Sequence, residues 1–315
     1  MPFLPPVLLA TLEILPMKST LLLALAVCSV IFSAVWAVEV YRNRKASWPS
    51  VRDCVIGLVM LFFDTLGIGC FAPTTAVYKL WNIVPDEDIP GTLNIGITLP
   101  AVAEGLIFMS IVDVDIKTLV SMIIAASLGA WLGAGVVAGW PRRKIQIGLG
   151  LTLLVTGGFM LMTIFHLLPI GGNLLGLQGY KLAIGIAANL VLGALMTLGI
   201  GFFAPCMVVV YLLGMSPMAA FPIMMGSVAF LGTVGSIRFI RKERYCWKPA
   251  IGMTIGGIPG VLLAAYLVRS LPLGPLRWLV FVVIIYTAAM MLRSAIKERS
   301  LPVAGSAPGE LEAEA

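Results

Sequence analysis

The sequence is poor in charge and in the side chains that most enzymes use. Only 11% of its 315 residues are charged, and it contains a single histidine. It also lacks a phosphate-binding loop of the GxxxxGK[ST] type, so ATP would need a separate subunit. These absences disfavour an enzyme, because few acids, bases or nucleophiles remain to build a catalytic site.

Cysteine usage is equally uninformative about chemistry. The chain has neither a CxxC pair nor the spacing of metal ligands, and buried apolar thiols are the ordinary alternative. We therefore predict no metal site and no cofactor. The five cysteines are Cys28, Cys54, Cys70, Cys206 and Cys246.

Apolar residues are abundant instead. They make up 60% of the chain, and the mean hydropathy of +1.03 is too high for a water-soluble domain. The apolar runs are continuous rather than alternating, which favours helices over strands. We predict an all-α membrane protein with about nine transmembrane helices, near residues 19–38, 54–80, 89–111, 117–139, 145–168, 181–212, 217–237, 248–268 and 276–294.

The net charge of +6 does not require nucleic acid, because the basic residues occupy short loops between apolar runs. In a nine-helix count three basic clusters fall on one side, which predicts that this side is cytoplasmic. The acidic loop at residues 86–88 then lies outside. The basic segment 142–144 also lies outside in this count, which conflicts with the rule. A re-entrant segment, a miscounted helix or the weakness of the rule would each explain the conflict. The three clusters are Arg42, Arg44, Lys45 and Arg52; Arg238, Arg241, Lys242, Arg244 and Lys248; and Arg293, Lys297 and Arg299.

A duplicated segment organises the chain. TLGIGCFAP at residues 65–73 returns as TLGIGFFAP at 197–205, and the same offset of 132 aligns Pro85 with Pro217 and Pro90 with Pro222. We predict two four-helix repeats, with four apolar runs each, that share one orientation. Re-entrant breaks would instead make the repeat inverted. The predicted parts are 1–50 (an extra helix and loop), 51–168 (first repeat), 169–182 (linker), 183–294 (second repeat) and 295–315 (a disordered tail).

The duplicated stretch is typical of a broken helix. Glycines free the backbone, and a proline fits the first position of a restarted helix, which we predict for Pro73 and Pro205. A helix that starts inside the membrane presents N–H groups and a positive dipole end to an anion. Close helix packing is the alternative role of glycine. The glycines concerned are Gly67, Gly69, Gly199 and Gly201.

Small polar side chains follow both breaks. Hydroxyl, thiol and amide groups near the restarted helices suit a desolvated oxyanion, although they also serve helix packing. The predicted substrate contacts are Thr74, Thr75, Thr92, Asn94, Cys206 and Ser227, together with the glycines and prolines of the breaks.

Two carboxyl groups fall within apolar runs, Asp64 and Glu104, where an ionisable residue is costly. The matching positions in the second repeat are Met196 and Ser236. This asymmetry suggests proton coupling, with a neutral or hydrogen-bonded buried carboxyl as the alternative. His166 fits a structural role, and Lys79 fits either anion attraction or snorkelling to the interface.

The repeated break, the proline-led helices and the turn GMSPMAAFPIMMGS at residues 214–227 together resemble the TauE/SafE family of anion transporters, also called the sulfite exporter or TSUP family. The resemblance covers residues 51–294. Family members commonly carry a glycine run followed by a proline, which is thinned here to GIGCFAP and GIGFFAP, and the first half has NIVPDEDIPGTLN at the turn.

The resemblance implies a multi-pass permease of the cytoplasmic membrane for a small anion such as sulfite, thiosulfate or sulfoacetate. A secondary transporter, with proton coupling left open, is the leading hypothesis. A passive anion channel is the alternative, and an intramembrane enzyme is the least favoured. The expected partners are the small anion and the lipid bilayer; no nucleic acid is expected, and homo-oligomer formation is left open.

Overall fold

The computed structural model describes residues 6–42, 48–66, 69–167, 172–199 and 201–267, and scattered helical positions between 278 and 296. These residues are mostly helical, and no strand occurs among them. Six of their helices are long and apolar enough to cross a membrane, which supports a multi-pass membrane protein. The predicted count of nine spans is not reached within this part of the chain. Gly67 and most of the predicted tail lie outside the described residues.

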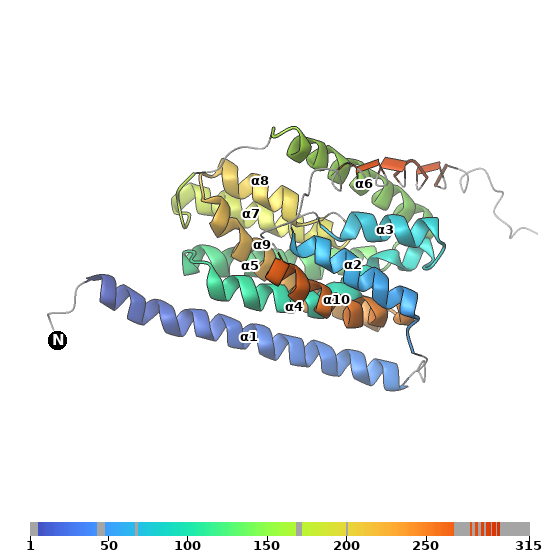
Figure 1. Ribbon diagram of the computed structural model, residues 1–315, viewed down its shortest axis with the longest axis horizontal. Helices are drawn as coiled ribbons and strands as arrows, with labels where there is room; N and C mark the ends of the chain where they lie inside the picture. Colours follow the sequence, from blue (N-terminus) through green and yellow to red (C-terminus); the bar gives the residue numbers. More distant parts are fainter. Residues whose placement is uncertain are drawn as a thin grey trace, which may run out of the picture.

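The first helix, α1 (Pro6–Arg42), lies along one side of the bundle (Figure 1). It packs against α9 (Pro217–Arg241) and α4 (Ile89–Ile111). In the first half of α1, Lys18 donates a hydrogen bond to the carbonyl of Ser110 at the end of α4 (3.1 Å). The apolar surface of α1 therefore joins the bundle on one face and is left for lipid on the other.

The predicted helix at 54–80 is two helices that enter and leave at the same end of the bundle. They are α2 (Val51–Thr65) and α3 (Phe71–Leu80). Lys79, near the end of α3, pairs with Asp86 in the short helix η1 (Asp86–Asp88), which leads directly into α4. The start of α4 in turn meets the start of α10 (Trp247–Leu267), where the Cys246 N–H donates to Thr92 Oγ1 (2.9 Å).

The predicted helix at 181–212 is likewise two helices, α7 (Gly179–Met196) and α8 (Phe203–Leu212). They enter and leave at the opposite end, where Lys181 donates to the carbonyl of Leu213 (3.1 Å). At this end α5 (Ile116–Val137) begins, and the Asp115 N–H donates to the Leu175 carbonyl (2.8 Å). Both broken segments are thus re-entrant hairpins, one from each end.

The helices after each hairpin run in opposite directions. Thr98 of α4 meets Ser236 of α9 (Oγ1 to Oγ, 3.1 Å), and Gly105 of α4 packs against Ala229, which lies earlier in α9. Helices α4 and α9 are therefore antiparallel. The predicted common orientation of the halves is wrong, because each hairpin returns to the side on which it started and leaves an odd number of crossings. The re-entrant alternative holds.

Glycine allows two matching helix pairs to pack closely. A methyl group on Gly256 of α10 would collide with the backbone of Cys54 in α2, and one on Gly193 of α7 would collide with Ala126 in α5. Small residues let membrane helices approach until backbone atoms touch. Gly256 and Gly193 therefore serve close helix packing, the alternative role that the sequence left open for glycine.

The basic segments meet at one end of the bundle. The Arg244 guanidinium donates to the carbonyl of Trp140 (2.8 Å), just before α6 (Arg142–Ile164), and Gln146 of α6 donates to Asp86 (2.8 Å). Segment 142–144 therefore lies with the cluster at 238–248, which removes the conflict in the sequence-based topology. The acidic loop lies at this same end, so its predicted placement on the opposite side is wrong.

Candidate functional site: a cavity between two broken helices

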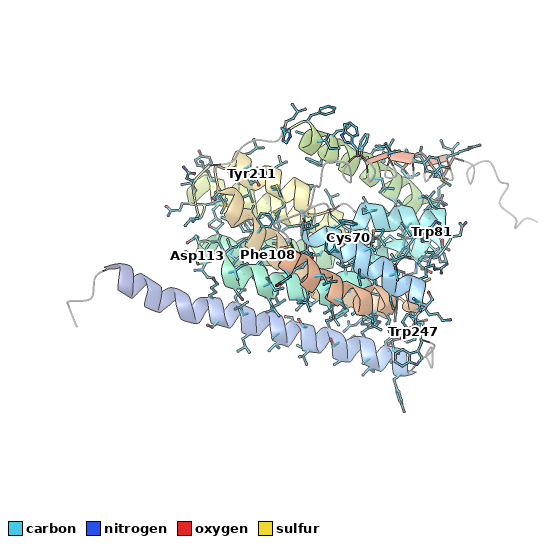
Figure 2. The ribbon with its side chains drawn as sticks, in the orientation of Figure 1. Cys70, Trp81, Phe108, Asp113, Tyr211 and Trp247 are labelled. Atoms are coloured by element: carbon cyan, nitrogen blue, oxygen red, sulfur yellow. The ribbon has the colours of Figure 1, made fainter. Side chains whose placement is uncertain are left out.

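The two breaks, 132 residues apart in the sequence, meet around one small central cavity of about 30 Å³. Figure 2 shows Cys70 in the middle of the bundle, with Trp81 and Trp247 toward one end and Asp113 toward the other. A volume of 30 Å³ accommodates about one water molecule. The lining residues are Asp64, Gly69, Cys70, Phe71 and Ala72 from the first hairpin, Met196, Gly201, Phe202, Phe203 and Pro205 from the second, and Phe159 and Val228 from α6 and α9.

At the breaks glycine serves the backbone rather than packing. Gly69 has φ of +86° and Gly199 has φ of +97°, a left-handed conformation that other residues rarely adopt. A Cβ on Gly69 or Gly201 would meet no atom within 4 Å, in contrast to the glycines between α2 and α10. The described parts of both stretches therefore behave as the predicted breaks.

Pro73 and Pro205 do not begin the restarted helices. Helix α3 starts at Phe71 and α8 at Phe203, so each proline is the third helical residue and the predicted first position is wrong. The third residue tolerates proline for the same reason as the first, because its N–H has no intrahelical acceptor. Pro205 lines the cavity. Pro73 is buried and directly follows Ala72, which also lines the cavity.

The carboxyl group of Asp64 lies across the first break. Its Oδ1 accepts a hydrogen bond from the Cys70 N–H at 2.6 Å, just before α3 begins. Asp64 is 4% exposed and lines the cavity, so an acid of the chain itself occupies part of the helix start where an external anion was expected. The matching position of the second half is Met196, which offers no such group.

Glu104 is joined to the same hairpin. The Thr65 hydroxyl oxygen lies 2.6 Å from Glu104 Oε1 and 2.9 Å from the carbonyl of Leu61. Glu104 Oε2 is buried with no hydrogen-bond partner among the described residues. Within that part of the chain, no lysine, arginine or histidine forms an ion pair with Asp64 or Glu104. Two acids therefore lie close to the break without a cation.

Four of the predicted polar contacts lie near the breaks without lining the cavity. Thr74 donates to the Cys70 carbonyl (2.7 Å), and the Cys206 thiol donates to Asn189 Oδ1 (3.7 Å). The hydroxyls of Thr75 and Ser227 are buried and have no partner among the described residues. Unlike Thr74 and Cys206, these two hydroxyls are still able to bond a new ligand.

Thr92 and Asn94 lie at the start of α4, at the basic end of the bundle. Thr92 donates to the Asp88 carbonyl (2.8 Å), and Asn94 donates to the Pro90 carbonyl (2.7 Å). Neither residue lines the cavity. Both side chains donate to backbone carbonyls four residues earlier in the chain, and Thr92 also joins α4 to the start of α10 by accepting from the Cys246 N–H.

The other two polar residues singled out in the sequence also lie away from the cavity. The Lys79 ammonium is held 2.6 Å from Asp86 Oδ2, and both side chains are nearly buried. His166 is exposed just after α6, with φ of +53°. Lys79 is thus neutralised within the chain, and snorkelling is not its role.

Sequence reasoning missed most of the apolar wall of the cavity. Phe202 and Phe203 belong to the repeated motif itself, whereas Phe159 and Val228 come from distant helices that only folding brings near. Among the described residues no group of three or more His, Cys, Asp or Glu side chains is arranged to hold a metal ion.

Comparisons with known proteins gave one match. No curated protein and no solved structure matched the chain. One family model did match, over residues 181–312, which include the second hairpin and α9 and α10. Its description is Sulfite exporter TauE/SafE, so this part of the chain is similar to the family that the repeated motif resembles.

Proposed function

We propose that this protein is a secondary transporter that moves a small anion across the cytoplasmic membrane by alternating access. The observation that carries the proposal is the meeting of two re-entrant hairpins, one from each end, around a single central cavity. Oppositely inserted hairpins that meet near the midplane are a recurring transporter architecture. We regard the two halves as an inverted repeat.

The small cavity fits a closed arrangement. A polyatomic oxyanion needs more room than one water molecule, so a hairpin must move before substrate enters. Each hairpin leads to its own end of the bundle, which gives each a natural role as the gate of that end. A permanently open channel would need a continuous passage instead.

The partial family match and the groups around the cavity support the proposed substrate class. The first-turn N–H groups of α3 and α8 have no intrahelical acceptors, and their helix dipoles favour negative charge. The buried hydroxyls of Thr75 and Ser227 add donors once the cavity widens. We propose a sulfur-containing oxyanion or organosulfonate, such as sulfite, thiosulfate or sulfoacetate.

Proton coupling is part of the proposal. An ionised Asp64 repels an anion at the start of α3, whereas a protonated Asp64 does not, so proton and anion would bind together. Glu104 supports a proton-carrying pair, because the single hydrogen of the Thr65 hydroxyl cannot satisfy both Leu61 and an ionised Glu104. A proton on Glu104 completes both contacts.

Orientation follows from charge. The basic segments at 142–144 and 238–248 share one end of the bundle, and basic residues flanking membrane helices favour the cytoplasm. We propose that this end is cytoplasmic, so the first hairpin gates the inside and the second gates the outside.

The test is flux through purified protein in liposomes, with sulfite, thiosulfate, sulfoacetate and simple carboxylates, with and without a pH gradient. We expect saturable flux of one sulfur-containing anion, and we expect the pH gradient to accelerate this flux. Gly201→Leu, which adds a side chain at the cavity wall, is the matched variant that should stop flux yet keep thermal stability. Flux that does not saturate and ignores the gradient would favour a channel, and equal flux in both proteins would remove the cavity from the mechanism.

A further inference from the structure

A long apolar groove lies between α1, α5 and α9. Its volume is about 790 Å³, and its walls include Ala24 of α1, Phe230 of α9 and a row of α5 side chains from Val120 to Trp131. The rise from Val120 to Trp131 is ~16 Å, about the depth of one leaflet, since the whole hydrocarbon core is ~30 Å thick. Thr20 and Ser127 are the hydroxyl-bearing residues of this lining. The groove therefore suits a hydrocarbon chain better than a polar peptide.

Two basic side chains, Arg238 and Lys242, lie near Trp131 at one end of the groove. The Arg238 guanidinium lies over the Trp131 ring, 3.7 Å from its centroid. Lys242 donates to the carbonyl of Gly135, one turn further along α5 (3.0 Å), and its surroundings are exposed. Among the described residues neither cation forms an ion pair with a carboxylate. Their charge is thus available to an anionic group at the membrane surface.

From these two features we infer a binding site for an anionic phospholipid. Its acyl chain lies in the groove between α1 and α5, and its phosphate meets Arg238 and Lys242. A neutral lipid would leave both cations without a counterion, whereas a second protein chain would have to fill a groove of leaflet depth. The site is separate from the central cavity, and no residue lines both.

Native mass spectrometry of protein taken from phosphatidylcholine vesicles with and without phosphatidylglycerol tests the site. The wild type should retain phosphatidylglycerol in preference to phosphatidylcholine. The double variant Arg238→Gln with Lys242→Gln should retain phosphatidylglycerol roughly thirtyfold more weakly, because each lost cation weakens binding a little more than about fivefold. Lys117→Gln removes an exposed cation at the opposite end of α5 and should change nothing.

The groove itself has a separate test. Ala24→Trp places a bulky ring in the groove and should displace the lipid although both cations remain. Each variant must elute as the same monodisperse species as the wild type, so that misfolding is recognised. Equal retention of both lipids, unchanged retention in the double variant, or a second protein copy in place of lipid would overturn the inference.

Discussion

The two hairpins share a motif but differ in charge. In the first, Asp64 accepts from the Cys70 N–H at the start of α3, and Thr65 contacts Glu104. In the second, Met196 occupies the position that matches Asp64, and Thr197 donates to the Ala194 carbonyl (2.7 Å). The two similar hairpins thus present an internal acid on one side of the cavity and, among the described residues, a helix start without a side-chain cap on the other. We propose that the first hairpin binds the proton and that the second hairpin binds the anion.

The backbone breaks also differ in detail. With the offset of 132, Gly69 matches Gly201, yet only Gly69 of these two has a positive φ, whereas Gly199 carries it in the second hairpin. Gly67, which aligns with Gly199, lies outside the described residues. A duplicated sequence does not guarantee duplicated angles once the neighbouring helices differ.

The largest effect is expected from Gly199→Ala. Its φ of +97° costs a residue with a Cβ ~1–2 kcal/mol, and the added atom would lie 3.0 Å from Leu149 Cδ2. We expect a clear fall in melting temperature and at least about a tenfold loss of flux. Gly201→Ala, two residues away and with free space, should melt like the wild type. Equal melting temperatures for the two variants would contradict the assigned break.

Asp64→Asn should separate transport from the proton gradient. Asparagine keeps an oxygen acceptor for the Cys70 N–H but carries no charge and binds no proton. We expect flux to persist, within about tenfold, while its acceleration by an inward pH gradient disappears. Glu104→Gln is the companion variant. A pH response that survives in Asp64→Asn assigns the carboxyl to helix capping alone.

Met196→Asp should make the second hairpin resemble the first, with a smaller effect. A carboxylate at this cavity wall repels the anion, so the apparent affinity should fall several-fold at neutral pH and recover on acidification as the new group is protonated. Met196→Asn is the uncharged control. Affinity that is insensitive to pH in Met196→Asp would mean that the anion does not approach the second break.

The sequence predicted the breaks well because their cause is local. Glycine at a left-handed angle and proline without an N–H are properties of single residues, and their repetition drew attention to 65–73 and 197–205. The two buried acids were also evident, since charge within an apolar run stands out. The neighbours of these residues were not evident, because Phe159 and Val228 reach the cavity from separate helices.

By itself the sequence determined that this chain is helical, belongs in a bilayer and breaks two helices at matching places, because hydropathy and backbone freedom are written residue by residue. Only the tertiary structure decided that the breaks are re-entrant, that the acidic loop lies with the basic clusters and that Thr92 and Asn94 lie at the start of α4, away from the cavity. Whether a short helix crosses or turns back depends on which neighbours it packs against, and those contacts lie far away in the chain.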